Sequence, residues 1–87
     1  MKLGPWIKLE RDQTEARSIA GYDPVSDGPS RRAIVGPAAK LEGGFNWMTR
    51  LVHGGHVDVG HEDTIDGAKR AADANLRRQG VELSDAS

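Results

Sequence analysis

The sequence contains no cysteine, and this absence excludes disulfide bonds and thiol chemistry. No apolar run approaches the roughly 20 residues that a membrane-spanning helix needs. Residues 1–10, MKLGPWIKLE, lack the apolar centre of a signal peptide. We therefore expect a cytoplasmic protein with no membrane partner.

An excess of charge of one sign is missing as well. The 12 basic and 13 acidic side chains leave a net charge of -1, and the isoelectric point is about 6.3. A dedicated nucleic-acid-binding protein usually carries more positive charge, so this balance argues against one. The length of 87 residues predicts a single domain, residues 1–87, with a small core.

The clearest local pattern is a hairpin around His53-Gly54-Gly55, where two apolar runs flank a pair of glycines. The length of the loop decides which side chains share a face of the sheet. A two-residue loop places Val57 and Val59 on the face of Arg50, opposite Trp47. A three-residue loop gathers the apolar side chains of both strands on one face. We prefer the three-residue loop, because the face that is buried fixes the register.

The preferred register leaves the second face of the hairpin uncovered. Arg50 then lies opposite Asp58 across the two strands, and polar and apolar side chains surround this pair. The candidate partner-binding residues are Asn46, Met48, Arg50, Val52, His56 and Asp58.

A helix is predicted after the hairpin. Asp63 or Thr64 can cap its first backbone N–H groups, and Gly80 is a natural stop after its last turn. Asp73 and Arg77 stand four residues apart, so we expect them to form an ion pair. Apolar residues recur at spacings of three and four and form one narrow, alanine-rich stripe that suits close packing on a sheet: Ile65, Ala68, Ala72 and Leu76.

The first half of the chain carries weaker strand signals. Trp6–Glu10 alternates in polarity, Ser18–Tyr22 is a shorter candidate, and Arg31–Val35 is a further strand. Gly36-Pro37 would break or bulge that strand, which suits the edge of a sheet. Asp23–Ser30 is dense in Pro, Gly, Ser and Asp and predicts a surface loop.

Together these segments predict an α+β fold, with an antiparallel sheet of four to five strands and one C-terminal helix packed on one face. Val81 and Leu83 add a last short strand, and Trp6 and Tyr22 are expected to be buried. The predicted core comprises Ile7, Leu9, Ile34, Phe45, Trp47, Leu51, Val57, Val59, Ile65, Ala68, Ala72 and Leu76.

Residues that suit catalysis or metal binding are sparse. His53, His56 and His61 fall within nine residues, but the preferred register separates His56 from His61, so we assign no metal site. The Gly43-Gly44 and Gly54-Gly55 pairs lack the strand–loop–helix setting of a phosphate loop. The serines lack the context of a nucleophile elbow. We expect no enzyme activity and no cofactor.

A motif of small residues spans the second strand of the hairpin and the helix. It consists of Val57-x-Val59-Gly60, then Thr64, then a helix with Ala68, Ala71, Ala72 and Asp73. This motif resembles the AP2-type domain and the related N-terminal arm-binding domains of phage integrases, over Phe45–Gln79. That family places one helix behind a three-stranded sheet and reads the DNA major groove with the sheet. The resemblance implies DNA-facing positions at Met48, Arg50, His56 and Asp58.

The general layout of strand, hairpin and helix is also similar to short accessory proteins of phages and mobile elements, some of which bind and block a host protein. Our first hypothesis is a small non-enzymatic protein-binding module that inhibits a host defence protein. The uncovered sheet face and the Asp23–Ser30 loop would make the contact, and the chain would be a monomer or a weak homodimer. The alternative is a DNA-binding domain in which Arg31, Arg32 and Arg50 contact phosphates or base edges.

Overall fold

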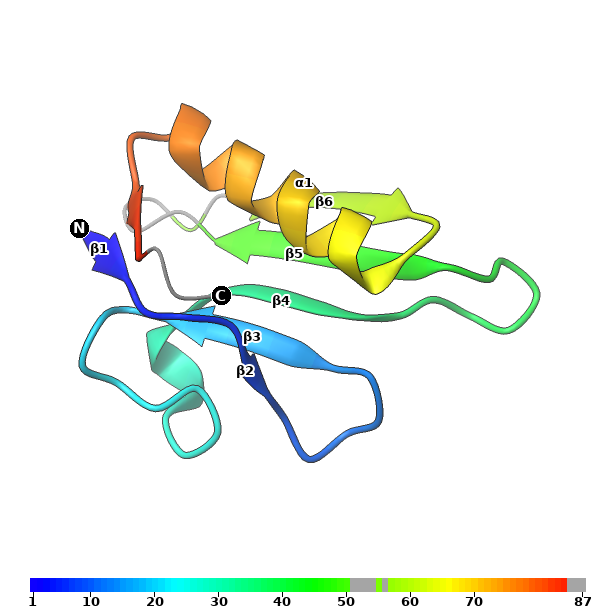
Figure 1. Cartoon of the computed structure of the whole chain (residues 1–87), viewed down its shortest axis with the longest axis horizontal. Coiled ribbons are helices and arrows are strands. Elements are labelled where there is room, and N and C mark those ends of the chain that lie inside the picture. The colour runs from blue at the N-terminus through cyan, green and yellow to red at the C-terminus, as the bar shows by residue number, and fades with distance from the viewer. Residues whose placement is uncertain (51–54, 56, 85–87) are drawn as a thin grey trace.

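A computed structural model describes residues 1–50, 55 and 57–84 of the chain. Strands β2 to β6 form one antiparallel sheet in the order of the sequence, and α1 covers one of its faces (Figure 1). The predicted α+β fold is therefore confirmed. The elements are β1 (Lys2–Leu3), β2 (Ile7–Lys8), β3 (Glu15–Ser18), the 3-10 helix η1 (Gly28–Ser30), β4 (Arg31–Pro37), β5 (Phe45–Arg50), β6 (Val57–Glu62), α1 (Ile65–Arg78) and β7 (Glu82–Leu83).

The first half of the sheet differs from the prediction in two places. β3 lies earlier in the chain than the strand predicted at Ser18–Tyr22 and shares only Ser18 with it. β4 lies between β3 and β5, so the expected sheet edge at Gly36-Pro37 was wrong. Gly36 stays in the ladder opposite Asn46. Its missing side chain leaves room for Thr14, whose Oγ1 would lie 3.2 Å from a Cβ at position 36.

The helix begins and ends where the sequence predicted. Thr64 Oγ1 accepts a hydrogen bond from the backbone N–H of Gly67 at 3.0 Å, which caps the first turn. Gly80 follows the last turn with a φ of 84°, a conformation that glycine adopts without steric cost. Across the residues that the structure describes, no helix is long and apolar enough to cross a membrane.

The core lies between α1 and the covered face of the sheet. Ala68, Ala72 and Leu76 are fully buried and pack with Ala33 and Val35 of β4. The alanine stripe was therefore predicted correctly, and it brings the helix close to the sheet. The predicted core residues that are partly buried against this cluster are Phe45, Trp47 and Ile65.

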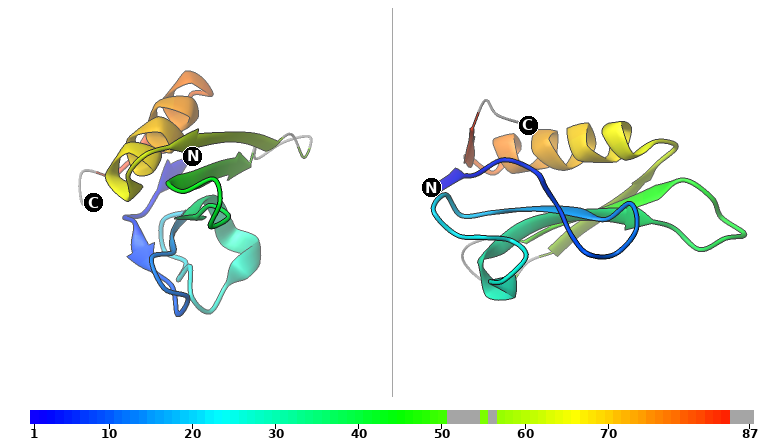
Figure 2. Two further views of the ribbon diagram at one scale, coloured as in Figure 1. Left: turned by 90° about the vertical axis from the view of Figure 1, so that its right-hand side faces the viewer. Right: turned by 60° about the horizontal axis from the view of Figure 1, so that its bottom comes forward.

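The N-terminal segment closes one end of this core. Leu3 is fully buried and Trp6 is 6% exposed, and both belong to the core cluster, whereas Tyr22 is exposed. β1 pairs in parallel with β7 in a separate two-stranded sheet, and the two strands lie side by side (Figure 2), with β1 also bridging to Ile19 directly after β3. The sequence analysis predicted the last strand but not β1.

A buried ion pair connects β3 to α1. Arg17 is only 2% exposed, and its Nη1 donates to Asp73 Oδ1 at 2.8 Å. The Trp6 indole N–H donates to the same oxygen at 3.2 Å, and the guanidinium carbon of Arg17 lies 5.6 Å from the centroid of the Trp6 ring. Among the described residues, Asp73 therefore pairs with Arg17, and the predicted pair with Arg77 was wrong.

The orientation of β6 is the main correction to the prediction. Met48 pairs with Val59 and Arg50 with Val57, so both valines point away from the helix and are 67% and 42% exposed, respectively. Their assignment to the core was wrong. The side chains of Val57 and Val59 therefore lie on the face of Arg50, as the two-residue loop predicts, and that is the alternative that we did not prefer. The loop itself lies largely outside the described residues.

A contact between Trp47 and Gly60 accounts for this orientation. The two residues are cross-strand partners on the covered face. A Cβ at position 60 would lie 2.4 Å from the Trp47 indole, so the indole occupies the space that any side chain there would need. Because Gly60 must face the helix beneath Trp47, Val59 and His61 must face the other way.

Three further residues of the predicted core need correction. Ile7 and Ile34 share the face of Met48, because the pairs Ile7–Ala16, Ala16–Ile34 and Ile34–Met48 run across the sheet. Both isoleucines are half-buried and lie outside the core cluster, as does Leu9. Leu51 lies outside the described residues.

Candidate functional site

The sheet face opposite α1, here called the open face, carries exposed apolar side chains. Ile34, Met48 and Val59 are consecutive cross-strand partners and form an apolar row over β4, β5 and β6. Met48 is 42% exposed and Val59 is 67% exposed. Exposed apolar side chains that adjoin one another in this way commonly mark a binding surface. The described residues of the open face on these strands include Ile34, Asn46, Met48, Arg50, Val57 and Val59.

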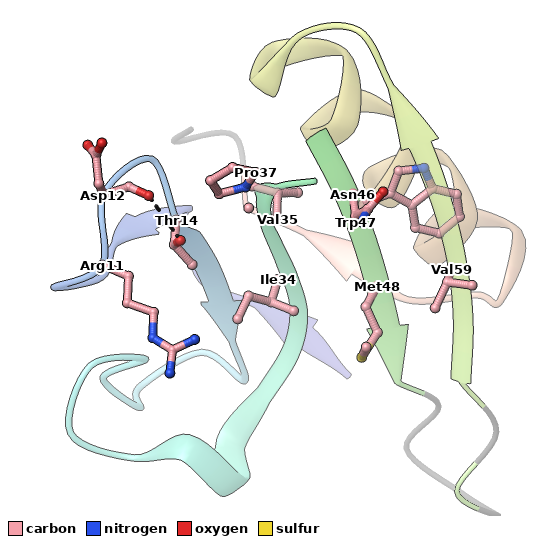
Figure 3. A pocket seen from close by; sticks show the side chains of 11 residues that line it. Arg11, Asp12, Thr14, Ile34, Val35, Pro37, Asn46, Trp47, Met48 and Val59 are labelled. Atoms are coloured by element: carbon pink, nitrogen blue, oxygen red, sulfur yellow. Dashed lines mark hydrogen bonds between the residues drawn. The ribbon is translucent and has the colours of Figure 1, made fainter. Parts of the chain in front are cut away.

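A hollow of about 510 Å³ lies over the apolar row (Figure 3). The turn between β2 and β3 forms its far wall and contributes Arg11, Asp12 and Thr14. Figure 3 shows these side chains across the hollow from Met48 and Val59. The hollow therefore has an apolar floor and one polar, charged wall, which suits an extended segment with side chains of both kinds.

A second hollow, of about 180 Å³, adjoins the first and shares Ile34 and Met48 with it. We call it the arginine hollow, because Arg31, Arg32 and Arg50 line it together and no acidic residue among those that the structure describes does so. Three arginines among the residues that line one small space favour an anionic group there.

Two of these arginines are held in place by backbone carbonyl groups. Arg31 Nε donates to the Pro24 carbonyl at 2.6 Å, and Arg32 Nη1 donates to the Pro29 carbonyl at 2.9 Å. Arg32 Nε is buried without a hydrogen-bond partner. Such anchoring reduces the conformational entropy that the side chains would lose on binding a ligand.

The loop Asp23–Ser30 supports this hollow. Its Asp23 carboxylate accepts a hydrogen bond from the backbone N–H of Val25 at 2.9 Å, and Pro24 and Ser30 are buried. The loop therefore packs on the sheet beside β4 and holds Arg31. Its predicted role as a direct contact stays a prediction.

The structure places half of the predicted partner-binding residues together. Asn46, Met48 and Arg50 are exposed on the open face, as the hairpin argument expected. Val52 and His56 lie outside the described residues. Asp58 was placed on the wrong face: it lies opposite Thr49 on the side that the helix covers.

Asp58 takes part in a polar network beneath the helix. Asn75 Nδ2 donates to Asp58 Oδ2 at 2.8 Å, and Thr49 Oγ1 donates to Asn75 Oδ1 at 2.6 Å. Asn75 and Thr49 are buried, so the network satisfies polar groups inside the core. This arrangement also removes one acidic side chain from the open face.

Sequence reasoning missed Ile34, Val57, Val59 and Arg11 as parts of the site. The valines were assigned to the core because the preferred three-residue loop put them on the face of Trp47, and Ile34 was assigned there as an apolar residue of a predicted strand. Gly60 was the signal that could have shown the orientation of β6. Trp47 needs a cross-strand partner without a side chain, so Gly60 faces the helix and both valines face the open side of the sheet. Arg11 comes from a turn whose position depends on tertiary packing, and no local pattern marked it.

The histidine cluster is only partly described. His61 Nε2 lies 2.7 Å from the Gly43 carbonyl oxygen and 3.6 Å from Glu42 Oε1. Within residues 1–50, 55 and 57–84, no group of three or more His, Cys, Asp or Glu side chains is arranged to hold a metal ion. His53 and His56 lie outside those residues, so the assignment of no metal site stays a prediction.

Comparison with known proteins gives one similarity. No protein-family model matches the chain, and no solved structure matches it. The chain is similar to acetaldehyde dehydrogenase 2 of Pseudomonas putida (strain W619), with 31% identity over 81 residues. The alignment covers 91% of this chain and 25% of that protein, so the chain spans about a quarter of its relative's length. The activity in that name belongs to the whole relative.

Proposed function

We propose that the chain is a protein-binding module whose open face takes an apolar and acidic segment of a partner protein. The observation that carries this proposal is the adjacency of the apolar row and the arginine hollow, which share Ile34 and Met48. Apolar contacts would supply most of the affinity, and the arginines would favour acidic partners over basic ones.

The likeness to short accessory proteins of phages and mobile elements favours a host protein as the partner. An inhibitor of this kind would act by covering a functional surface of that protein. A module of this kind needs no catalytic group and no cofactor of its own.

The proposal is tested by selection from a displayed random-peptide library on the immobilised protein. We expect the retained peptides to combine apolar residues with Asp and Glu. Met48→Lys places a charge in the apolar row and should weaken binding of these peptides at least about tenfold. Arg50→Glu should favour peptides with basic residues instead, because it changes the sign of one charge in the arginine hollow.

Two matched variants control for nonspecific effects. Leu41→Lys makes a similar change at a loop residue that is fully exposed, and Arg78→Glu reverses a charge at the end of α1. Both should retain the original peptides. The proposal fails if no peptides are enriched, or if Met48→Lys and Arg50→Glu bind the selected peptides as the unmodified protein does.

A second candidate function is DNA binding through the arginine hollow. It is favoured by the presence of Arg31, Arg32 and Arg50 in the lining of one hollow, with no acidic residue in the described part of that lining. It is also favoured by the position of Asp58, which would repel phosphate on the open face but lies on the covered face. The resemblance to AP2-type domains pointed to the same sheet.

A further inference from the structure

Strand β6 forms one edge of the main sheet, and although it carries the charged residues Asp58 and Glu62, it lacks other features that normally protect an edge. Among the described residues, no strand pairs with its second side. Its six residues include no lysine and no proline, and its pairing with β5 shows no bulge. Natural proteins usually protect a free edge with such features, because its unpaired backbone groups readily accept another strand.

We propose that β6 pairs with β6 of a second copy of this chain in antiparallel orientation, with Val59 opposite Val59 of the second copy. The two sheets would then form one continuous sheet, with a two-fold axis perpendicular to it between the two β6 strands. The helices of both copies would lie on the same side of this sheet. The proposal is independent of the partner that the open face binds.

The alternation of side chains limits the registers that are available. A two-fold axis perpendicular to the sheet keeps each residue on its own face, so one residue faces its own copy at the axis. The registers around the middle of β6 place residue 59 opposite 59, residue 58 opposite 58, or residue 60 opposite 60. The second choice places two Asp58 residues opposite each other. The third places Asp58 opposite Glu62. Like charges directly opposite each other are unfavourable across strands.

The remaining register has no such conflict. Val59 faces Val59, Val57 faces His61, and Asp58 faces Gly60, which has no side chain. Val57 and Val59 of each copy then extend the apolar surface of the open face across the contact between the two β6 strands. A contact between β-branched residues at the two-fold axis is favourable in an antiparallel pair.

The helices leave room for this pairing. α1 packs mainly on β5, with β4 and β6 on either side of it. In the dimer, β5 and the second β5 would be three strand spacings apart, or about 14 Å at about 4.8 Å per spacing. A helix with its side chains is about 10–12 Å across, so two helices fit side by side. One strand pair buries less than a standard interface, so we expect a weak, concentration-dependent dimer.

Disulfide trapping tests the register directly, because the chain has no cysteine of its own. Val59→Cys would place two thiols at the two-fold axis, within the range of a disulfide between opposite strand residues. We expect it to form covalent dimers much faster than Val25→Cys, a control whose exposed position, 41%, lies away from β6. Equal rates would overturn the proposal.

A mixture of two variants checks the register independently. Val57→Cys and His61→Cys should cross-link to each other faster than either cross-links to itself, because these positions are opposite only when Val59 faces Val59. Faster cross-linking of either variant with itself would overturn the register.

Sedimentation equilibrium then tests the association without a cross-link. The mass of the unmodified protein should rise with concentration, and Val59→Lys should remain monomeric because two ammonium groups would meet at the axis. Met48→Lys should still dimerise although it loses the selected peptides, which separates this proposal from the proposed function. A mass that stays monomeric for the unmodified protein at all concentrations would overturn the proposal.

Discussion

Arg17 is the largest side chain that the fold buries completely. A buried guanidinium is costly unless charged and polar partners surround it. Here Asp73, the Gly4 carbonyl and the Trp6 ring provide that environment. The sequence could not show this arrangement, because Asp73 lies 56 positions further along the chain and the segment around Arg17 has no clear strand pattern.

Removal of one partner of this ion pair should be much worse than removal of both. We expect Asp73→Ala to lower the free energy of unfolding by about 3–5 kcal/mol, because it leaves a buried positive charge unpaired. The double variant Arg17→Met, Asp73→Ala should recover a large part of that loss. Urea unfolding followed by tryptophan fluorescence measures both.

Asp66→Ala is a matched control, because it removes an exposed carboxylate from the same helix and should cost only about 0.3–1 kcal/mol. A double variant as unstable as Asp73→Ala alone would show that packing, and not the unpaired charge, dominates.

The elements differ in how much of their structure the local sequence determines. α1 was predicted closely, because its cap at Thr64, its alanine stripe and its stop at Gly80 all lie within the helix or next to it. The orientation of β6 was wrong, because it depends on a contact with Trp47 on the neighbouring strand. Three of the residues predicted on the open face nevertheless lie there, since Asn46, Met48 and Arg50 alternate with the partly buried Phe45 and Trp47.

A substitution at Gly60 tests the cause of this orientation. We expect Gly60→Ala to destabilise the protein by about 1–3 kcal/mol, because its methyl group would overlap the Trp47 indole. Gly28→Ala meets open space and should change stability by no more than about 0.5 kcal/mol. Thermal unfolding compares the two variants. If Gly60→Ala is equally harmless even though Trp47 is present, the steric explanation is wrong.

At the scale of the whole molecule, the charges nearly cancel but are unevenly distributed. The net charge is -1, yet three arginines line one small hollow that, among the described residues, has no acidic residue in its lining. The composition predicted the balance but not the gathering, because β4 and β5 become neighbours only through the sheet. A local patch of this kind steers an acidic partner without making the protein basic overall.

This distribution gives a test that separates protein binding from DNA binding. We expect weak binding to random duplex DNA, reduced to the same extent by Arg50→Glu and by Arg78→Glu. If the arginine hollow bound DNA, about three phosphate contacts would give a slope near -2.7 for log affinity against log salt concentration. Fluorescence anisotropy at several salt concentrations measures the slope. A steep slope that only Arg50→Glu removes would favour the DNA-binding alternative.

The pairing of β1 with β7 has a mechanical consequence. The two strands run parallel, and hydrogen bonds from Glu82 N–H to the Met1 carbonyl (3.0 Å) and from Ser84 N–H to the Leu3 carbonyl (3.1 Å) join them. A force that pulled the two ends of the chain apart would slide one strand along the other. It would strain both hydrogen bonds together, in shear.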